Sequence, residues 1–398
     1  MFESVARVPG DAILGLIQQF NDDPNPSKVD LGVGVYKDPE GRTPIMAAVK
    51  AAERAMVDVE QTKSYIGSHG DPHFGDEVAK LVFGADSAVL AAKRVSVTQA
   101  PGGTGALRLA MDFVSGQYPG KTIWLPEPTW PNHIAIANAA GLKIERYPYV
   151  DANNQLDFDA LLAKLKTLPA GDVVLLHACC HNPTGFDPSR EQWQAILGVV
   201  KERGLLPFID FAYQGFGDGL DEDAYSTRLF AENVDEVLIT QSCSKNFGLY
   251  RERTGSFIAV AKDAETTANV RSQLARVARA NYSNPPAHGA AVVTTILDSS
   301  ELRAQWLAEL DSMRNRINGV RRQFVDGLKP HGLGERFAFV ADQRGMFSYT
   351  GLTPAQVTVL REKHSIYMVG SGRANVAGLS EGNIAYVCQA IADVVGNG

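Results

Sequence analysis

The stretch SCSKNFGLYRER, residues 242–253, holds one lysine, Lys245, among small polar residues, followed by an apolar run and a charged triplet. A lysine in this setting is either an ordinary surface charge or an amine kept for chemistry. An amine of the second kind attacks carbonyl groups and forms imines. Ser242 and Arg253 lie on either side of Lys245 and offer a hydroxyl and a guanidinium.

Four further stretches place polar or aromatic side chains directly after an apolar run. In PGGTGALRL a glycine-rich turn opens a helix. Gly102 and Gly103 would let the backbone approach an anion, and Thr104 offers a hydroxyl near the helix N-terminus. The other stretches are TWPNH, HNPTG and IDFAYQGF, with the candidate residues Trp130, Asn182, Asp210 and Tyr213. Each has an ordinary explanation on its own, namely a tight strand–helix turn, a core indole, a turn amide or a structural ion pair.

Taken together, these side chains match one kind of ligand. An anion turn, an indole, an amide, a carboxylate with a phenol, and a lysine with an arginine fit a phosphorylated pyridine aldehyde held as a Schiff base. The lysine would form the imine, the carboxylate would keep the ring nitrogen protonated, and an aromatic side chain would cover the ring. The glycine-rich turn fits neither the P-loop nor the complete GxGxxG fingerprint.

Short apolar runs alternate with helical stretches between about residues 90 and 260. The candidate strands are RVSVTQA, KTIWLPEP, DVVLLHACC, GLLPFIDFAY, EVLITQSCS and GSFIAVA, and helical stretches such as Glu191 to Arg203 lie between them. Continuous apolar and β-branched runs are typical of buried strands in a parallel sheet. This order predicts an α/β sheet with helices on both faces, and ligands of such sheets bind outside the carboxyl ends of the strands.

A different pattern begins at Ser300. From Leu302 to Leu328, apolar residues recur every three or four positions and form one stripe on a single long helix, about 45 Å long at 1.5 Å per residue. Pro330 ends this helix. The segments that follow, RGMFSYTGL and HSIYMVGSGRANVAGL, indicate strands and turns of a second domain.

The composition limits the class of protein. The 398 residues carry a formal charge of −7, which argues against nucleic acid as a main partner. The four cysteines show no CxxC pair and no zinc spacing, which favours a reduced, cytoplasmic compartment and no metal site. The sequence has no apolar window of about 18 residues and no signal-peptide pattern, so we expect no membrane span.

Seven motifs occur in a fixed order along nearly the whole chain: GGTGAL, PTWPNH, HNPTG, DFAYQGF, SCSKNFGLYRER, ANYSNPPAHG and SGRANVAGL. In these motifs the sequence resembles the class I aminotransferases of the aspartate and aromatic amino acid aminotransferase family, which are fold type I pyridoxal-phosphate enzymes. The resemblance implies a large α/β domain, residues 44–312, with a mostly parallel seven-stranded sheet. It also implies a smaller α/β domain built from both termini, residues 1–43 and 313–398.

The resemblance further implies how pyridoxal 5′-phosphate is bound. Lys245 is expected to form the imine and carry the proton, and Asp210 to pair with the pyridine nitrogen. Tyr213 and Asn182 are expected to hydrogen-bond the phenolic oxygen of the ring, and Trp130 to stack on the ring. The phosphate is expected to contact Gly103, Thr104, Ser242, Arg253 and, from the neighbouring subunit, Tyr65. Many relatives carry serine where Gly102 stands, so Gly102 is given no side-chain role.

Amino acids and 2-oxo acids are the substrates that the resemblance implies, bound at sites shared across a homodimer. The α-carboxylate is expected to contact Arg373, Asn182 and the backbone at Gly34, since an arginine fork matches a carboxylate. Arg279 is expected to reach across the dimer to the second carboxylate of aspartate or glutamate. His133 and His177 are expected near Asp210, in a supporting role or as purely structural histidines.

The preferred amino donor is open between aspartate and an aromatic amino acid. The motifs GVYK, GGTGAL and YSNPP favour aspartate, whereas aromatic-acting relatives tend to read GLYY, GGSGAL and YSSPP. We therefore predict an aspartate aminotransferase that moves the amino group of L-aspartate reversibly to 2-oxoglutarate by a ping-pong mechanism, with some activity on aromatic amino acids. The alternative is an aromatic amino acid aminotransferase.

Three other classes fit less well. Ser242-x-x-Lys245 also matches the SxxK pattern of serine acyl-enzymes, but the companion motifs SDN and KTG do not occur in the sequence. A non-catalytic, cofactor-binding regulator would normally carry a basic DNA-binding region, and we find none. An NAD-dependent dehydrogenase would need the complete glycine fingerprint.

Overall fold

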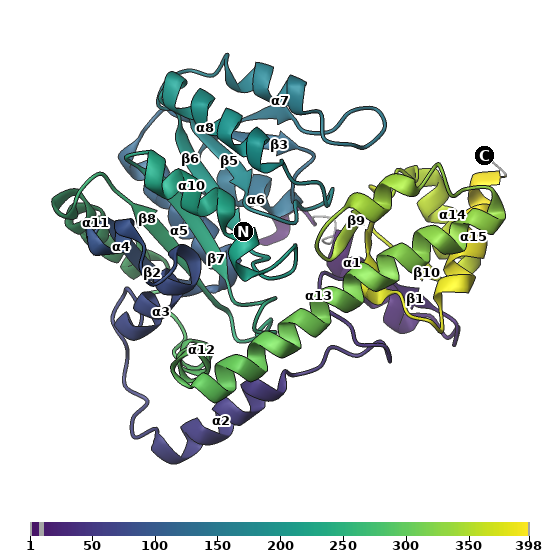
Figure 1. Cartoon of the computed structure of the whole chain (residues 1–398), viewed down its shortest axis with the longest axis horizontal. Coiled ribbons are helices and arrows are strands. Elements are labelled where there is room, and N and C mark those ends of the chain that lie inside the picture. Colours follow the sequence, from purple (N-terminus) through teal and green to yellow (C-terminus); the bar gives the residue numbers. More distant parts are fainter. Residues whose placement is uncertain (1, 8–11, 397–398) are drawn as a thin grey trace. The chain divides into compact units, whose positions relative to one another are not determined.

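The computed structural model describes residues 2–7 and 12–396, and it divides into two compact units (Figure 1). One unit is Pro44–Asn315, and the other joins Met1–Thr43 to Arg316–Gly398. Residues 1, 8–11, 397 and 398 of the predicted small domain lie outside the described residues.

A seven-stranded sheet forms the centre of the 44–315 unit (Figure 1). Its strands are β2 (Val95–Pro101), β3 (Thr122–Glu127), β4 (Lys143–Pro148), β5 (Val173–His177), β6 (Leu206–Phe211), β7 (Val237–Ser242) and β8 (Thr254–Val260). Their order is β2-β8-β7-β6-β5-β3-β4, with β8 antiparallel to both of its neighbours and the other pairs parallel. The predicted mostly parallel α/β sheet is confirmed.

Burial explains which strands the apolar pattern finds. Every residue of β5, β7 and β8 is buried, as expected of central strands covered on both faces. The pattern does not predict β4, because this edge strand is mostly exposed and buries only Tyr147.

The same unit contains helices before, between and after these strands. They are α2 (Ala47–Val59), α3 (Pro72–Phe83), α4 (Ala88–Ala91), α5 (Gly102–Gln117), α6 (Pro131–Ala139), α7 (Phe158–Leu165), α8 (Arg190–Arg203), α9 (Leu220–Asp223), α10 (Tyr225–Asn233), α11 (Ala264–Asn281) and α12 (His288–Asp298). The start of α8 is fixed by a capping box between Ser189 and Gln192, and its end by left-handed Gly204. The predicted helix from Glu191 to Arg203 is therefore confirmed.

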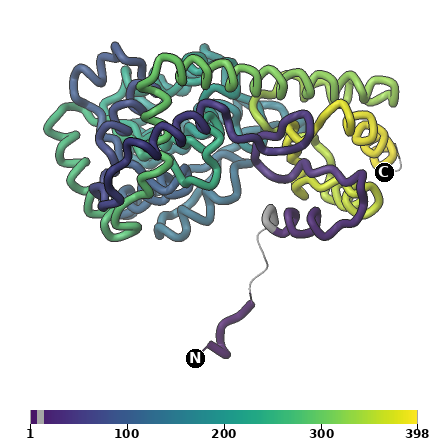
Figure 2. The backbone as a smooth tube through the Cα atoms, turned by 90° about the horizontal axis from the view of Figure 1, so that it is seen from below, coloured from purple at the N-terminus to yellow at the C-terminus, as the bar shows by residue number. Residues whose placement is uncertain are grey.

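The unit formed by both termini contains two short sheets. β1 (Val29–Asp30) pairs in parallel with β10 (Ile366–Tyr367), and β9 (Phe347–Tyr349) pairs antiparallel with β11 (Arg373–Asn375). Its helices are α1 (Ala12–Asp22), α14 (Pro354–His364) and α15 (Ile384–Gly396). In Figure 2 the purple N-terminal segment lies beside the yellow C-terminal segments, in agreement with the β1–β10 pairing.

The long helix predicted from Ser300 onward is α13 (Ser300–Leu328), and the division between the units falls within it. In the 44–315 unit, its residue Trp306 is fully buried, stacks on Phe247 at 4.4 Å between ring centroids, and donates its indole N–H to the carbonyl oxygen of Asn246 at 2.6 Å. Asn246 and Phe247 directly follow Lys245, so this helix fixes the chain next to the candidate amine.

Candidate active site

The candidate residues that lie at strand ends of the 44–315 unit meet at one edge of the sheet. β3, β5, β6 and β7 are parallel, so their carboxyl ends lie at this edge. β8 runs in the opposite direction and therefore begins there, with Thr254 beside Pro101 of β2 and Gly255 beside Ser242 of β7. The register thus brings the glycine-rich turn, Ser242 and Arg253 together, although they are far apart in the sequence.

Two glycines at the start of α5 contact the anion-binding candidates. A Cβ atom on Gly102 would lie 2.6 Å from Nη2 of Arg253, and one on Gly103 would lie 3.2 Å from Cβ of Ser242. Gly102 also has a φ of +70°, which favours glycine. Close approach and backbone conformation together explain why glycine, and not serine, stands at position 102.

This arrangement forms a cradle that suits a phosphate. α5 is 16 residues long, so the free amides of its first turn, which includes Thr104, and the helix dipole favour an anion at its N-terminus. Arg253 is exposed and donates Nη1–H to the carbonyl oxygen of Tyr250 at 2.8 Å. Ser242 is buried and accepts a hydrogen bond from the Ser244 amide at 3.2 Å.

Lys245 lies in the turn that follows β7. Its Nζ atom is 5.1 Å from the centroid of the Tyr213 ring, and Tyr213 is buried. The turn is held by a hydrogen bond from the Gly248 amide to the Lys245 carbonyl at 3.0 Å, and Gly248 has a φ of +64°. The amine is thus half-buried beside a phenol rather than extended into solvent.

Asp210 lies near the end of β6 and receives two hydrogen bonds. His133 Nε2 is 3.1 Å from its Oδ2 atom, and the Thr240 hydroxyl donates to Oδ1 at 3.1 Å. Burial raises the pKa of the Asp210 carboxyl, but the hydrogen bond and electrostatic effect of His133, the effect of His177 and the Thr240 hydrogen bond outweigh it. The pKa of Asp210 therefore lies below its usual value, which keeps the group anionic.

A chain of hydrogen bonds leads from Asn182 to Asp210. The Asn182 amide donates to Nδ1 of His177 at 3.4 Å, so His177 carries its proton on Nε2, which lies 3.3 Å from the Thr129 hydroxyl oxygen. Thr129 can then donate to Nδ1 of His133 at 2.8 Å, which leaves Nε2–H of His133 to donate to Asp210. The backbone amide of Asn182 thus sets both tautomers.

The imidazole of His177 stays neutral in this chain. Burial, aided by the electrostatic effect of His133, lowers the pKa of His177 to about 3. His181 packs on the His177 ring at 4.1 Å between centroids and on the Tyr149 ring at 3.8 Å. The two predicted neighbours of Asp210 therefore differ in position: His133 contacts it directly, and His177 reaches it through Thr129 and His133.

Asn182 and Trp130 occupy turns at the same edge. Asn182 is buried in the loop after β5, where Asp187 accepts hydrogen bonds from the amides of Cys180 at 2.7 Å and His181 at 2.9 Å. Trp130 caps the start of α6, and its ring lies edge-on to His133 with centroids 5.3 Å apart. The indole thus lies next to the imidazole that binds Asp210.

Two other candidates, Gly34 and Arg373, belong to the unit of both termini. Arg373 is buried, donates Nη2–H to the Gly32 carbonyl at 2.8 Å, and has its guanidinium 4.1 Å from the centroid of the Phe347 ring. A Cβ on Gly34 would lie 3.0 Å from Cζ of the same ring. Phe347 therefore packs against the two residues of this unit that are predicted to bind the substrate carboxylate.

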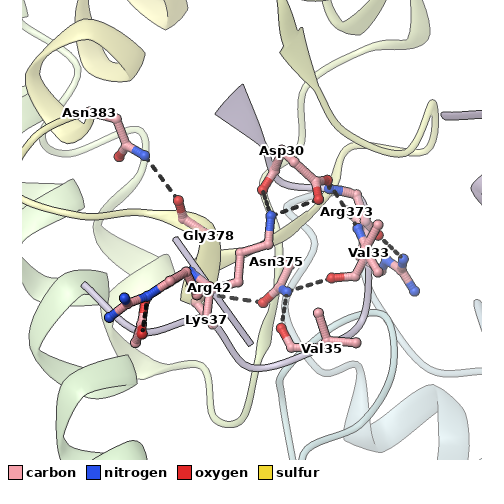
Figure 3. A network of polar contacts seen from close by, with 12 residues as sticks. Asp30, Val33, Val35, Lys37, Arg42, Arg373, Asn375, Gly378 and Asn383 are labelled. Carbon is pink, nitrogen blue, oxygen red and sulfur yellow. Dashed lines mark hydrogen bonds and ion pairs between the residues drawn. The ribbon is translucent and has the colours of Figure 1, made fainter. Parts of the chain in front are cut away.

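A polar network holds the loop that carries Gly34 (Figure 3). The side-chain amide of Asn375 donates to the carbonyl oxygens of Val33 and, at 2.8 Å, Val35. Lys37 forms an ion pair with Asp30 at 2.7 Å, and both side chains are largely buried. The loop is thereby tied to β11, the strand that contains Arg373.

The two residues predicted to act across a dimer are both exposed. Tyr65 is 94% exposed, and Arg279 near the end of α11 donates a hydrogen bond to the Ser283 hydroxyl. Asn284 donates its side-chain N–H to the carbonyl oxygen of Ile66, the residue after Tyr65. This bond connects the segments that carry Tyr65 and Arg279.

Several supporting residues were not predicted from the sequence. Thr129 forms hydrogen bonds with His133 and His177, and Thr240 donates one to the Asp210 carboxylate. Asp187 accepts hydrogen bonds in the loop that carries Asn182. The ring of Phe347 packs against the Arg373 guanidinium. Only Thr129 gives a signal, since it lies four residues before His133 within PTWPNH. Arg251 is exposed, and nothing in the structure explains it.

The chain was compared with known families and proteins. The family model for aminotransferase class I and II matches residues 26–391. The chain is 58% identical over 393 residues to an aromatic-amino-acid aminotransferase of Pseudomonas aeruginosa, which covers 99% of this chain and 98% of that protein. It is 50% identical over 396 residues to an aspartate aminotransferase of Escherichia coli, with 99% and 100% covered.

The chain belongs to this aminotransferase family.

Solved structures agree with the assignment. An aromatic-amino-acid aminotransferase from Burkholderia pseudomallei, covalently bound to pyridoxal phosphate, has a TM-score of 0.96, 46% identity and 99% coverage of both chains. The aspartate aminotransferase from Saccharomyces cerevisiae cytoplasm has a TM-score of 0.97, 40% identity, and coverage of 100% of this chain and 99% of that one. The expected fold type I, aminotransferase activity and pyridoxal 5′-phosphate cofactor are thus confirmed.

The side chains at the carboxyl ends of the strands fit pyridoxal phosphate. The cradle at the start of α5 suits the phosphate, the anionic Asp210 suits a protonated ring nitrogen, and the half-buried Lys245 offers an amine at the same edge of the sheet. None of the described helices is long and apolar enough to cross a membrane.

Proposed function

We propose that this aminotransferase transfers the amino group of L-aspartate reversibly to 2-oxoglutarate, giving oxaloacetate and L-glutamate, and that it also accepts aromatic amino acids. The observation that carries the proposal is the single sheet edge that unites an amine beside a phenol, a buried anionic carboxylate and a phosphate cradle. Such a set of side chains can bind a phosphorylated pyridine cofactor and transfer the proton on the Cα atom of an amino acid.

The cofactor-binding roles are part of this proposal. Pyridoxal phosphate, when bound, supplies an electron sink for the substrate Cα carbon. Asp210 holds the ring nitrogen protonated, and Lys245 is the point of covalent attachment. The ring contacts Trp130, Asn182 and Tyr213, and the phosphate contacts Gly103, Thr104, Ser242, Arg253 and, from the partner subunit, Tyr65.

The proton and substrate roles follow from the same residues. Lys245 Nζ would accept the proton of the substrate Cα atom and carry it in the 1,3-proton transfer, with Tyr213 beside it. Arg373, the backbone at Gly34 and Asn182 bind the α-carboxylate. Arg279 binds the second carboxylate of a substrate held by the partner subunit.

We further propose that the protein is a cytoplasmic homodimer and that each subunit has two domains. The exposure of Tyr65 and Arg279, which are linked through Asn284, supports a homodimer with shared sites. Residues 44–312 would act as the large domain, and residues 1–43 with 313–398 as the small one. All four cysteines are buried free thiols, which supports a cytoplasmic location.

An aromatic amino acid aminotransferase is the second candidate function. It is favoured by the 58% identity to the Pseudomonas aeruginosa aromatic-amino-acid enzyme. Aspartate is favoured by Lys37 in GVYK, Thr104 in GGTGAL and Asn284 in YSNPP. The test is to compare kcat/KM for aspartate and phenylalanine with 2-oxoglutarate as acceptor: a higher value for aspartate supports the first function, and a higher value for phenylalanine replaces it with the second.

A further inference from the structure

Arg321 is an arginine in the core of the terminal unit. Only 1% of it is exposed, and it lies on α13 facing β9. Its guanidinium donates to the carbonyl oxygens of Phe347 at 3.2 Å and Gly345, and its Nε–H to the Ser348 hydroxyl at 3.4 Å. Burying a guanidinium is unfavourable compared with a well-packed apolar side chain, so this residue contributes something other than stability alone.

The strand that Arg321 holds supports the predicted carboxylate site. Phe347 is bound through its carbonyl oxygen on one side, while its ring packs 4.1 Å from the Arg373 guanidinium. The same ring limits the space at Gly34, where a Cβ would lie 3.0 Å away. A shift of β9 would therefore move the surface on which both Arg373 and the Gly34 backbone rest.

Arg316, five residues earlier on α13, binds two further segments of this unit: the residues just after β11 and the loop after Gly34. It donates to the carbonyl oxygens of Ala377 at 3.2 Å and Leu379 at 2.8 Å, just beyond the strand that contains Arg373. It also donates to the carbonyl oxygen of Asp38 at 3.2 Å, in the loop that follows Gly34. Two arginines of one helix thus bind, through backbone oxygens, all three segments around the predicted site.

We propose that Arg321 and Arg316 are positioning residues that fix Arg373 and the Gly34 backbone for binding the substrate carboxylate. The proposal rests on the carboxylate-binding role given above to Arg373. Arginine suits this task because its planar fork donates several hydrogen bonds in fixed directions, whereas lysine offers a single flexible ammonium. A site held too loosely binds more weakly even when its contacting residues are intact.

The experiment compares Arg321→Lys and Arg316→Lys with a control, Arg322→Lys, in the holoenzyme. Arg322 is the exposed neighbour of Arg321 on the same helix. We expect both test variants to raise KM for the amino acid and the oxo acid about tenfold and to change kcat much less. The calorimetric Kd for succinate, a dicarboxylate with no reactive group, should rise by a similar factor. The cofactor absorbance spectrum should not change.

A double-mutant cycle tests whether Arg321 acts through Arg373. If it does, adding Arg321→Lys to Arg373→Lys weakens succinate binding less than the two single effects together. Additive effects, or a KM equal to that of Arg322→Lys in both test variants, would overturn the inference. If Arg373→Lys alone leaves KM and succinate binding unchanged, the proposed carboxylate site itself is wrong, which separates the two failures.

Discussion

The Nε2 atom of His133 lies 3.1 Å from the Oδ2 atom of Asp210, and the imidazole is completely buried. Thr129 and His177 fix the direction of this hydrogen bond, so the donor is His133 and the acceptor is the carboxylate. Together with Thr240, this contact keeps the pKa of Asp210 below its usual value despite burial. Asp210 is therefore anionic at the pH values at which an aminotransferase works.

Replacing Asp210 with asparagine removes that charge. Asp210 is proposed to pair with the protonated ring nitrogen of the cofactor, and loss of one partner of a buried charge pair costs about 2–5 kcal/mol. We therefore expect kcat/KM of Asp210→Asn for aspartate to fall by about a hundredfold or more. The exposed Asp235→Asn serves as control. Steady-state kinetics with bound cofactor quantified by absorbance checks the expectation, and an Asp210→Asn enzyme with the control's kcat/KM would contradict it.

Removing the amine of Lys245 should abolish turnover. We expect Lys245→Ala to lose more than about a thousandfold in kcat, because no other amine takes over the proton transfer. Borohydride reduction followed by mass spectrometry should find cofactor attached to the peptide with residue 245 only in the wild-type enzyme. Lys262→Ala, at an exposed position, should behave as wild type; attachment at another lysine would refute the assignment.

The cradle predicts that alanine weakens cofactor binding at one glycine of α5 and leaves it unchanged at another. Gly102→Ala places a Cβ 2.6 Å from Arg253 Nη2 at a φ of +70°, so it should weaken cofactor binding, by about tenfold in Kd for a 1.4 kcal/mol strain. Gly116→Ala in the same helix meets no atom within 4 Å and should leave cofactor Kd unchanged, while raising stability by about 0.5–1 kcal/mol. Equal cofactor Kd values for the two variants would rule out the cradle.

The lowered pKa of His177 predicts that the stability of the protein depends on pH. Its pKa is lowered from 6.5 to about 3 in the folded protein, so between these values the unfolded chain binds a proton that the folded chain does not. The free energy of unfolding should therefore be unaffected by this group above pH 6.5 and should fall as the pH drops, by about 1.4 kcal/mol per unit.

Denaturant unfolding between pH 7 and 4 measures this slope. His177→Asn removes the titrating group, so its slope should be shallower than that of the wild type. His331→Asn, at an exposed position, is the control. A His177→Asn slope equal to the wild-type slope would show that the imidazole titrates normally.

The sequence is informative where one property decides the structure. Six strands are predicted because each contains an apolar run that is mostly buried, and α13 because its apolar stripe recurs regularly. The strand β4 is not predicted, since an exposed edge strand such as KIERYP has no apolar run. Sheet order is also absent from such patterns: nothing in GSFIAVA indicates that β8 inserts antiparallel between β2 and β7.

The residues of the candidate site likewise fall into those that the sequence predicts and those that it does not. Residues at strand ends can be found from their position after apolar runs, and the resemblance supplies their roles. The residues that orient them cannot be found in this way, because their contacts depend on side-chain direction across different elements. Thr129, Thr240 and Arg321 are of this kind: each is an unremarkable polar residue until the fold places it against Asp210, His133 or β9.

The position of β8 has a consequence for how the protein is made. β2 stands at the end of the sheet order and pairs with β8, where Val95 meets Val260, more than a hundred residues later in the chain. On the ribosome, the glycine turn after β2 therefore emerges long before Ser242 and Arg253 exist to complete it. If Ser242 and Arg253 hold the phosphate as proposed, the nascent chain cannot bind it until the loop from β7 to β8 has been synthesised, and we expect cofactor capture to be a late event of folding. Contacts of such long sequence separation also form slowly.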